Sequence, residues 1–355
     1  MENVVQKLAE YMASLGHESY VVTYNRLRRQ GKMELPTREV INGVNVIRIK
    51  PDFAWAHGSY SKELPDVIRE IDPDVLHVHG WRHPLVFQVA RLKKRMQFKA
   101  IIHTHAPFHS LNQLGFVVWL YHRSIDRFMA NSLAEFDAVV ALTPFERDVL
   151  VERLKVPREK ITCIPNGLDD DFERYSNSFK TREHTVLYMG ALSRLKNVQL
   201  LADSMGRVIS KVPDARLILA GEDQGALSNV MRNEKSASFE YVGVVKDTER
   251  YKTLGTAQVF VHPCLYEAFG ISLIEAQSLG KPCVITGEGG QLYSAPVMKT
   301  SLHAEPNPTD FGDKIVKLLT NSTLYDELSQ NATSWAFEHR WSKLLPKYDA
   351  LYGIG

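Results

Sequence analysis

Short apolar runs alternate with longer amphipathic stretches along the whole chain. Most of the short runs are continuous rather than alternating, which is typical of parallel strands that are buried on both faces. Because helical stretches separate the runs, we expect right-handed crossovers and doubly wound α/β sheets. Strands are predicted at 20–24, 45–50, 74–79, 100–105, 138–143 and 161–165, and in a second series at 185–190, 215–221, 239–243, 258–263 and 282–286.

Other segments carry their own signals. The sequence INGVNV (41–46) contains Asn-Gly, which predicts a tight hairpin. The bulky apolar segment LGFVVWLYHR (114–123) predicts a helix packed on a sheet, and it is also a candidate border of an acceptor site. Helical periods at 309–320, 323–339 and 341–352 close the chain.

The length and the two strand series predict two domains, because 355 residues exceed one ordinary core. The join should lie in the polar stretch 169–185, which has neither a helical nor a strand period. We therefore predict Rossmann-like domains over 1–170 and 171–335, and a C-terminal helix within 336–355 that packs back on the first domain. Ligands of such sheets bind beyond the carboxyl ends of the strands, so two facing sheets would form a cleft lined by strand ends.

The composition, 44% apolar and 24% charged residues, is that of a globular protein. A net charge of +2 gives no strong field for nucleic acid, so none is expected as a partner. Cys163, Cys264 and Cys283 lie in apolar runs without metal-ligand spacing and are predicted to be buried, reduced thiols. No apolar run reaches the roughly 18 residues of a membrane span, and no signal-peptide pattern is seen, so a cytoplasmic protein is expected.

The segment YEAFGISLIEA (266–276) carries the most specific chemistry. It sets Glu267 and Glu275 eight positions apart, before and within a helix predicted to run from near Ile271 to Gly280. The unpaired N–H groups at the start of that helix, around Phe269, Gly270 and Ile271, favour an anionic or hydroxylated ligand. Carboxylates accept hydrogen bonds from sugar hydroxyls, and a helix start donates to phosphate. Together these groups fit a nucleotide-sugar.

The same segment has a simpler interpretation. SLIE (272–275) matches a capping box in which Ser272 is the N-cap and Glu275 reaches back to it. This alternative explains neither Glu267 nor the glycine of the loop.

PCLYEAFGISLIEAQSLGKPCVIT (263–286), followed by Gly-Gly at 289–290, resembles the signature of glycosyltransferase family 4, whose mark is Glu, seven residues, Glu. The segments IPNGLD (164–169), YMGALSRLKN (188–197) and LILAGEDQGAL (217–227) resemble further family segments in the same order. The resemblance implies retaining enzymes of the GT-B fold, in which two Rossmann-like doubly wound domains face each other across a cleft. The first domain would serve the acceptor, and the second would bind the nucleotide-sugar.

The resemblance also implies roles for residues of the second domain. Glu275 would hold the donor ribose, Glu267 would contact the donor sugar, and Lys196 would neutralise the diphosphate. The donor would also meet the backbone amides of Phe269, Gly270 and Ile271, and a loop that Gly289 and Gly290 let pass close to it.

His105, at the end of a predicted strand, would lie at the catalytic centre, whereas His79 and His103 are predicted to be structural. No metal or other cofactor is implied. The acceptor hydroxyl would attack the anomeric carbon on the face that the nucleotide leaves, and a donor phosphate oxygen would take its proton.

Two features depart from the family pattern. Ala191 stands where the family usually has arginine directly after the glycine of the phosphate turn, and Arg194 is expected to substitute for it. The helix predicted at the N-terminus normally follows a first strand and a glycine-rich loop, which the printed sequence does not contain. A degenerate, non-catalytic nucleotide-binding homologue therefore remains an alternative, as does a nucleotide-sugar epimerase of the same fold.

The predicted function is transfer of a sugar from a UDP- or GDP-sugar to a hydroxyl of a sugar or a lipid-linked acceptor, as in polysaccharide or glycolipid biosynthesis. Basic runs at 25–32 and 91–95 are interpreted as solvated surface. The alternative is adhesion to anionic lipid, which would place the protein peripherally at the inner face of the membrane.

Overall fold

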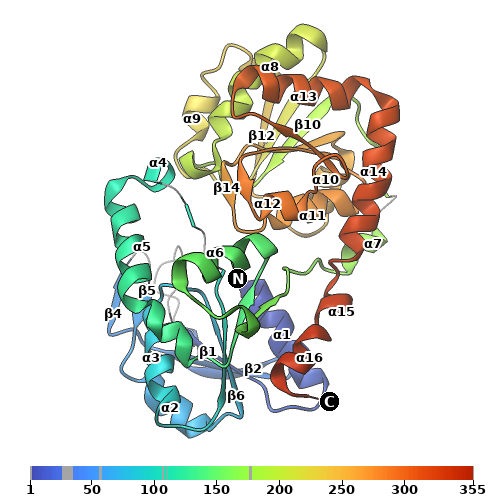
Figure 1. Ribbon diagram of the computed structural model, residues 1–355. Coiled ribbons are helices and arrows are strands. Elements are labelled where there is room, and N and C mark those ends of the chain that lie inside the picture. The colour runs from blue at the N-terminus through green and yellow to red at the C-terminus, as the bar shows by residue number, and fades with distance from the viewer. Residues whose placement is uncertain are drawn as a thin grey trace. The chain divides into compact units, whose positions relative to one another are not determined.

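The computed structural model describes residues 2–25, 35–55, 58–105, 108–109, 111–175 and 178–354. The chain divides into two compact units. The first comprises Met1–Ala106, Phe116–Ile164 and Leu344–Gly355, and the second comprises Pro107–Gly115 and Pro165–Lys343. Each unit combines helices with a mainly parallel sheet (Figure 1).

The first unit contains a parallel sheet in which the strands follow chain order. Its strands are β6 (Val75–His79), β7 (Lys99–His103), β8 (Ala138–Ala141) and β9 (Ile161–Cys163). The helices that connect or flank them are α2 (Leu64–Ile71), α3 (Pro84–Lys93), α5 (Phe116–Met129) and α6 (Pro144–Leu154). Helix α6 shows why such an element starts where it does: the Thr143 side chain accepts from the backbone N–H of Glu146, and Pro144 occupies the first turn.

A second sheet of this unit has the order β1-β3-β2 and follows α1 (Glu2–Ser14). Strand β1 (Tyr20–Tyr24) pairs parallel with β3 (Val44–Ile49), which pairs antiparallel with β2 (Arg38–Ile41). Asn42 and Gly43 join β2 to β3 at φ 51° and 82°, which confirms the predicted hairpin. A further hairpin joins β4 (Phe53–Trp55) and β5 (Gly58–Tyr60). No described strand pairs with both β1 and β6, so the strands described in this unit form separate sheets, β1-β3-β2, β4-β5 and β6-β7-β8-β9, instead of one continuous sheet.

The C-terminal segment of the chain corrects one prediction. Instead of one helix over 341–352, the chain forms α15 (Trp341–Leu344) and α16 (Lys347–Tyr352). Pro346 separates them because it has no N–H to donate and is suited to begin a helix instead. Within the first unit, the Tyr11 hydroxyl donates to Asp349, and the Tyr352 hydroxyl lies 2.7 Å from Nδ1 of His77.

The second unit contains a six-stranded parallel sheet with the order β12-β11-β10-β13-β15-β17. Its strands are β10 (Thr185–Met189), β11 (Arg216–Ala220), β12 (Phe239–Gly243), β13 (Val259–His262), β15 (Cys283–Thr286) and β17 (Ser301–Ala304). All the strand predictions of both series are confirmed. Strand β17 was not predicted, nor was the small parallel pair of β14 (Tyr266–Glu267) and β16 (Glu288–Gly289).

Helices of the second unit precede, connect and follow these strands (Figure 1). They are α4 (Leu111–Leu114), α7 (Asp171–Arg174), α8 (Val198–Lys211), α9 (Leu227–Val230), α10 (Asp247–Thr256), α11 (Ile271–Ser278), α12 (Gln291–Ser294), α13 (Pro308–Thr320) and α14 (Ser322–Phe337). Helices α8 and α13 bury Met205, Val208, Phe311 and Ile315 in the core beside the strands. Each such side chain stabilises the fold by roughly 1.5–3 kcal/mol.

Two composition-based expectations can be compared with the structure. The three cysteines are free thiols, of which Cys264 and Cys283 are buried as predicted, while Cys163 is only half-buried. Cys163 belongs to β9, the last strand of its sheet, where one side has no neighbouring strand to cover it. Among the described residues, no helix combines the length and the apolar character that crossing a membrane requires.

Candidate active site in the second unit

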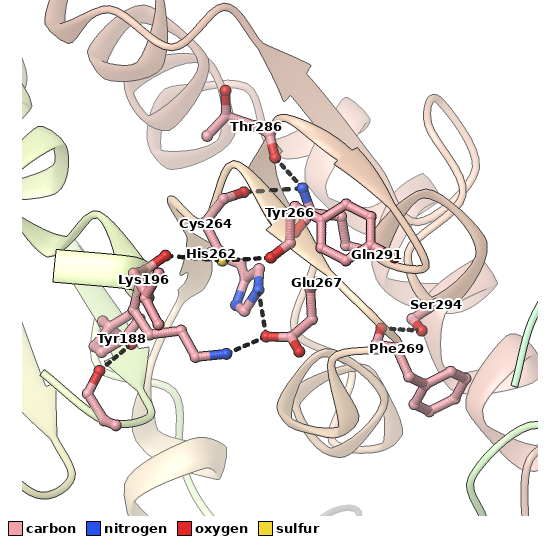
Figure 2. Close-up of polar contacts among 12 residues, drawn as sticks. Tyr188, Lys196, His262, Cys264, Tyr266, Glu267, Phe269, Thr286, Gln291 and Ser294 are labelled. Atoms are coloured by element: carbon pink, nitrogen blue, oxygen red, sulfur yellow. Dashed lines mark hydrogen bonds and ion pairs between the residues drawn. The ribbon is translucent and has the colours of Figure 1, made fainter. Parts of the chain in front are cut away.

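The strand order of the second unit reverses between β10 and β13. In open parallel sheets, ligands bind beyond the carboxyl ends of the strands at this switch point. After β10 the chain passes through Gly190 into a 3₁₀ turn, Arg194–Lys196. After β13 it passes through Pro263 into β14. These two connections bring the side chains of Lys196 and Glu267 together (Figure 2).

Lys196 donates a hydrogen bond through Nζ to Oε2 of Glu267, and both side chains keep partial exposure, 29% and 20%. Burial raises the pKa of the Glu267 carboxyl, but the Lys196 charge, His262 and the hydrogen bond from Lys196 together outweigh burial, so the pKa lies below its ordinary value. Burial lowers the pKa of the Lys196 ammonium, but the charge of Glu267, the neighbouring Cys264 and the hydrogen bond to Glu267 together leave it above its ordinary value. Both groups are therefore charged at neutral pH and reachable from solvent.

His262 and Cys264 line the buried side of this pair. Nε2 of His262 lies 3.7 Å from Oε2 of Glu267, and burial lowers the pKa of this imidazole to about 4. The thiol of Cys264 donates to the carbonyl of Tyr266, and burial raises its pKa to about 11. A protonated thiol is a poor nucleophile, and the charged groups of this cluster are Glu267 and Lys196. The atoms of His262, Cys264 and Glu267 lie close enough to hold a metal ion, but the ammonium of Lys196 already occupies the carboxylate.

Helix α11 begins at Ile271, as predicted, behind Gly270. Gly270 has φ 83°, and a Cβ there would lie 2.9 Å from Cδ1 of Leu273, so the turn requires glycine. No side chain caps this helix start, and its first N–H groups have no intrahelical acceptors. They therefore offer donors for an anion. The aromatic ring of Phe269 is buried, whereas Ile271 is partly exposed.

The capping-box interpretation of 272–275 is wrong. The N-cap is Gly270 instead of Ser272, and the Glu275 side chain points to another partner. Glu275 is ion-paired with Arg250 of α10, and only 6% of the Glu275 side chain is exposed. Arg250 also lies over the ring of Phe172, 5.6 Å from its centroid. The glutamate holds α10 against α11 instead of closing its own helix start.

Gly289 and Gly290 pack against the loop that carries Glu267. Strand β16 pairs Gly289 with Glu267, and the N–H of Gly290 donates to the Glu267 carbonyl at 2.7 Å. A Cβ at Gly290 would lie 1.8 Å from the carbonyl oxygen of Ala268. The two glycines therefore permit the close approach of two backbones, a reason for Gly-Gly that is visible only in the fold.

Arg194 does not join this cluster. It is exposed at the start of the 3₁₀ turn, and within the described part of the chain no ion pair involves it. Ala191 is held by its backbone, because its carbonyl accepts from the Tyr188 hydroxyl at 2.8 Å.

His105 belongs to the first unit. Its backbone has φ 45°, a left-handed conformation. Its ring stacks on His103 at 3.8 Å, and Nε2 lies 3.2 Å from Nδ1 of His79. The predicted site residues thus fall into a connected group in the second unit and a histidine group in the first.

Three further residues contact the predicted site residues or their neighbours in the described structure. Arg250 gave no local signal, because only the packing of α10 on α11 brings it to Glu275. His262 ends β13 and lies five residues before Glu267, a spacing that can be read from the sequence. His109, which belongs to the second unit, packs edge-on against Tyr266 at 5.3 Å.

Family models match most of the chain. "Glycosyltransferase Family 4" matches residues 1–172, and "Glycosyl transferases group 1" matches residues 169–335. Mannosylfructose-phosphate synthase of Agrobacterium fabrum is 32% identical over 216 residues, which cover 55% of this chain and only 47% of that relative. An uncharacterized glycosyltransferase of Methanocaldococcus jannaschii is 24% identical over 98% of this chain and 92% of its own length.

Solved structures show the same architecture. Anabaena HepE in complex with UDP-glucose superposes with a TM-score of 0.74 at 14% identity, covering 98% of this chain and 95% of that chain. At this identity the likeness shows the fold, two Rossmann-like domains of the GT-B type. Together with the two family models, it establishes that the chain belongs to glycosyltransferase family 4.

Proposed function

We propose that this glycosyltransferase is retaining and metal-independent, and that it transfers a sugar from a UDP- or GDP-sugar to a hydroxyl of a sugar or a lipid-linked acceptor. The observation that carries the proposal is the Lys196–Glu267 pair at the β10/β13 switch point, beside the uncapped start of α11. A cation and free N–H groups suit a diphosphate, and a carboxylate suits sugar hydroxyls. HepE, with the same fold, has been solved with UDP-glucose.

The proposed donor site uses the second unit throughout. Lys196 neutralises the diphosphate, and the backbone N–H groups of Phe269, Gly270 and Ile271, which lead into the start of α11, donate to phosphate or to the sugar. Glu267 accepts from sugar hydroxyls. Arg194 supports the diphosphate from the exposed end of its turn, and Gly289 and Gly290 shape the adjoining loop.

Glu275 is proposed to hold the ribose together with Arg250. An ionised carboxylate has about four lone-pair sites, so the ion pair with Arg250 leaves room for ribose hydroxyls. In this arrangement Arg250 fixes the carboxylate before the donor arrives, which reduces the entropy lost on binding.

The proposed reaction breaks the bond between the anomeric carbon and the diphosphate oxygen and forms a bond to the acceptor oxygen on the same face. The acceptor proton passes to a donor phosphate oxygen. Lys196 and the helix start stabilise the charge that develops on the leaving diphosphate. His105 is proposed to contact the donor sugar from the acceptor-side domain. No protein nucleophile takes part.

The proposal is tested with purified protein and a panel of UDP- and GDP-sugars, by calorimetry and then by product analysis with simple sugar and lipid-linked acceptors. The expected product keeps the anomeric configuration of the donor, and Glu267→Gln and Lys196→Ala reduce turnover. An inverted product would contradict the mechanism. An epimerised nucleotide-sugar without acceptor product would favour the epimerase, and no turnover across the panel would favour a degenerate homologue.

A lipid surface is the proposed partner of helix α5. Its outward face carries Val117 and Phe128, which are 79% and 78% exposed, together with exposed Phe116 and Leu120. Arg123 and Arg127 are exposed on the same helix, whereas its one acid, Asp126, is bound inward by Arg82. Exposed apolar and cationic side chains without an acid suit the interface of an anionic membrane. The basic run 91–95 lies at the end of α3 in the same unit, while most of 25–32 falls outside the described residues.

A further inference from the structure

Four histidines gather at the carboxyl ends of β6 and β7. His77 and His79 are two positions apart on β6, so both side chains lie on one face of the sheet. His103 ends β7 opposite His79 in the strand register, and His105 follows two positions later. The sequence patterns His-x-His on adjacent strands therefore build one cluster of imidazoles.

The rings are in close contact. His77 and His79 have centroids 4.3 Å apart, and His79 lies 5.4 Å from His103. One ring nitrogen from each of these three residues lies within 4.8 Å of the others. When histidine nitrogens bind a zinc ion tetrahedrally with Zn–N bonds of about 2.0–2.1 Å, they lie about 3.4 Å from one another. Small rotations of the rings thus suffice to converge on one ion.

Several ring nitrogens of the cluster have no hydrogen-bond partner. His103 is completely buried, and neither of its ring nitrogens has a partner. His77 uses Nδ1 toward the Tyr352 hydroxyl, whereas its Nε2 is buried without one. His79 uses Nδ1 toward His105. A buried imidazole nitrogen without an acceptor or donor is unfavourable, so such groups are normally satisfied by protein, water or metal.

His77 and His79 show the pattern of metal-binding histidines, in which a neighbouring group fixes one ring nitrogen and thereby sets the tautomer, while the other nitrogen can bind the ion. His103 offers either ring nitrogen.

We propose that His77, His79 and His103 form a binding site for a divalent first-row transition metal, with Zn²⁺ as the best fit. Three nitrogen ligands suit zinc and leave a fourth position for water. Tyr352 and His105 act as orienting groups for His77 and His79. Because Tyr352 belongs to α16, the ion also ties the C-terminal helix to the sheet of the first unit.

This proposal does not rest on the proposed transfer reaction. The site lies in the first unit, and none of its three ligands is a residue of the proposed donor site; His105, which is proposed to contact the donor sugar, only orients His79. Loss of metal binding therefore leaves the donor-binding assignments intact, and a failure of sugar transfer leaves the metal site intact.

The test uses the untagged full chain, freed of metal with a chelator and titrated with Co²⁺ and then Zn²⁺. We expect one ion per chain, with the visible ligand-field absorption of four-coordinate cobalt, which Zn²⁺ removes. His103→Ala and His77→Gln should each weaken binding at least tenfold, and Tyr352→Phe about tenfold. Exposed His17→Gln is the matched control and should bind as the parent does.

Folding is checked separately, because the metal-free parent and the metal-free variants should melt at similar temperatures while only the parent and His17→Gln gain stability from Zn²⁺. Absence of saturable binding in the parent would overturn the proposal. So would binding that is unchanged in both His103→Ala and His77→Gln.

Discussion

Arg250 is ion-paired with Glu275, the second carboxylate of the Glu-x₇-Glu pattern, whose side chain is almost fully buried. Arg250→Ala leaves that carboxylate buried without its partner. We expect the free energy of unfolding to fall by about 2–4 kcal/mol, somewhat less than for a fully buried pair because Arg250 is partly exposed. Urea denaturation of parent and variant measures the change.

The double variant Arg250→Ala/Glu275→Gln is the control for this pair. Removing the charge that Arg250 neutralised should recover part of the lost stability, giving a coupling energy on the order of 1 kcal/mol or more in a double-mutant cycle. Strict additivity of the two substitutions would show that the pair does not stabilise the fold.

Lys196→Ala is expected to weaken binding of a UDP- or GDP-sugar about tenfold to a hundredfold, the equivalent of one charge-assisted hydrogen bond to phosphate. Arg194→Ala should weaken it less, because that side chain is exposed and outside the Lys196–Glu267 cluster. Calorimetry measures both, with exposed Lys235→Ala as the control. Equal affinity of the Lys196 variant and the parent would remove Lys196 from the donor site.

Gly290→Ala is expected to destabilise the protein by about 1–3 kcal/mol and to weaken donor binding, because its Cβ would overlap the Ala268 carbonyl. Gly206→Ala is the matched control. It lies inside α8 with nothing within 4 Å of an added Cβ. There the same change should stabilise the fold by roughly 0.5–1 kcal/mol. Thermal melts with and without nucleotide-sugar distinguish the two effects, and a neutral Gly290→Ala would contradict the backbone contact.

Lys281 predicts a pH dependence of stability. Its side chain is buried, donates to the Thr181 hydroxyl at 2.8 Å, and has its pKa lowered by burial to about 8. In the unfolded chain the pKa is about 10.4. Between these two pKa values Lys281 is protonated in the unfolded state but largely neutral in the folded state, so the free energy of unfolding rises with pH. Below pH 8 Lys281 is protonated in both states, so its contribution to stability does not change with pH.

Between pH 8 and pH 10 the free energy of unfolding of the parent should rise by roughly 2–3 kcal/mol relative to that of Lys281→Met. Urea midpoints across that range give the difference between the two proteins. Parallel curves for parent and variant would show that Lys281 keeps an ordinary pKa.

Helix α5 is expected to bind vesicles that contain anionic phospholipid and to leave neutral vesicles unbound. The double variant Val117→Glu/Phe128→Glu should lose this binding, because it places two negative charges on the outward face. Exposed Val244→Glu in the second unit is the control. Flotation of the parent and the variants with vesicles measures this binding. Equal flotation of the parent and the α5 variant would exclude α5 as the segment that contacts the membrane.

The strands were predictable because their buried apolar runs contain the signal in consecutive residues, as in 185–190 and 258–263. Strand β17 (Ser301–Ala304) was not predicted because Ser301 and His303 interrupt the apolar run that signals a buried strand. The break at Pro346 could have been predicted from the proline itself. The two-residue strands β14 and β16 have no periodicity of their own and exist only because their loops pair.

The site was only partly predictable for a similar reason. The spacing of Glu267 and Glu275 and the start of α11 at Ile271 follow from local sequence. The partners of those carboxylates do not, because Lys196 and Arg250 reach them from distant segments through the strand order and the packing of α10. The histidine cluster was predictable only in part. Both His-x-His patterns are visible in the sequence, but the β6–β7 register is needed to show that they are neighbours.

The pairing of β14 with β16 has a mechanical consequence. Glu267 is joined through its own backbone to Gly289 and Gly290, so the acidic loop and the glycine loop are displaced together or not at all. A force applied to either loop by an incoming molecule is shared by both. An insertion that separates β14 from β16 is therefore expected to weaken ligand binding at the proposed donor site, even if every side chain of that site is kept.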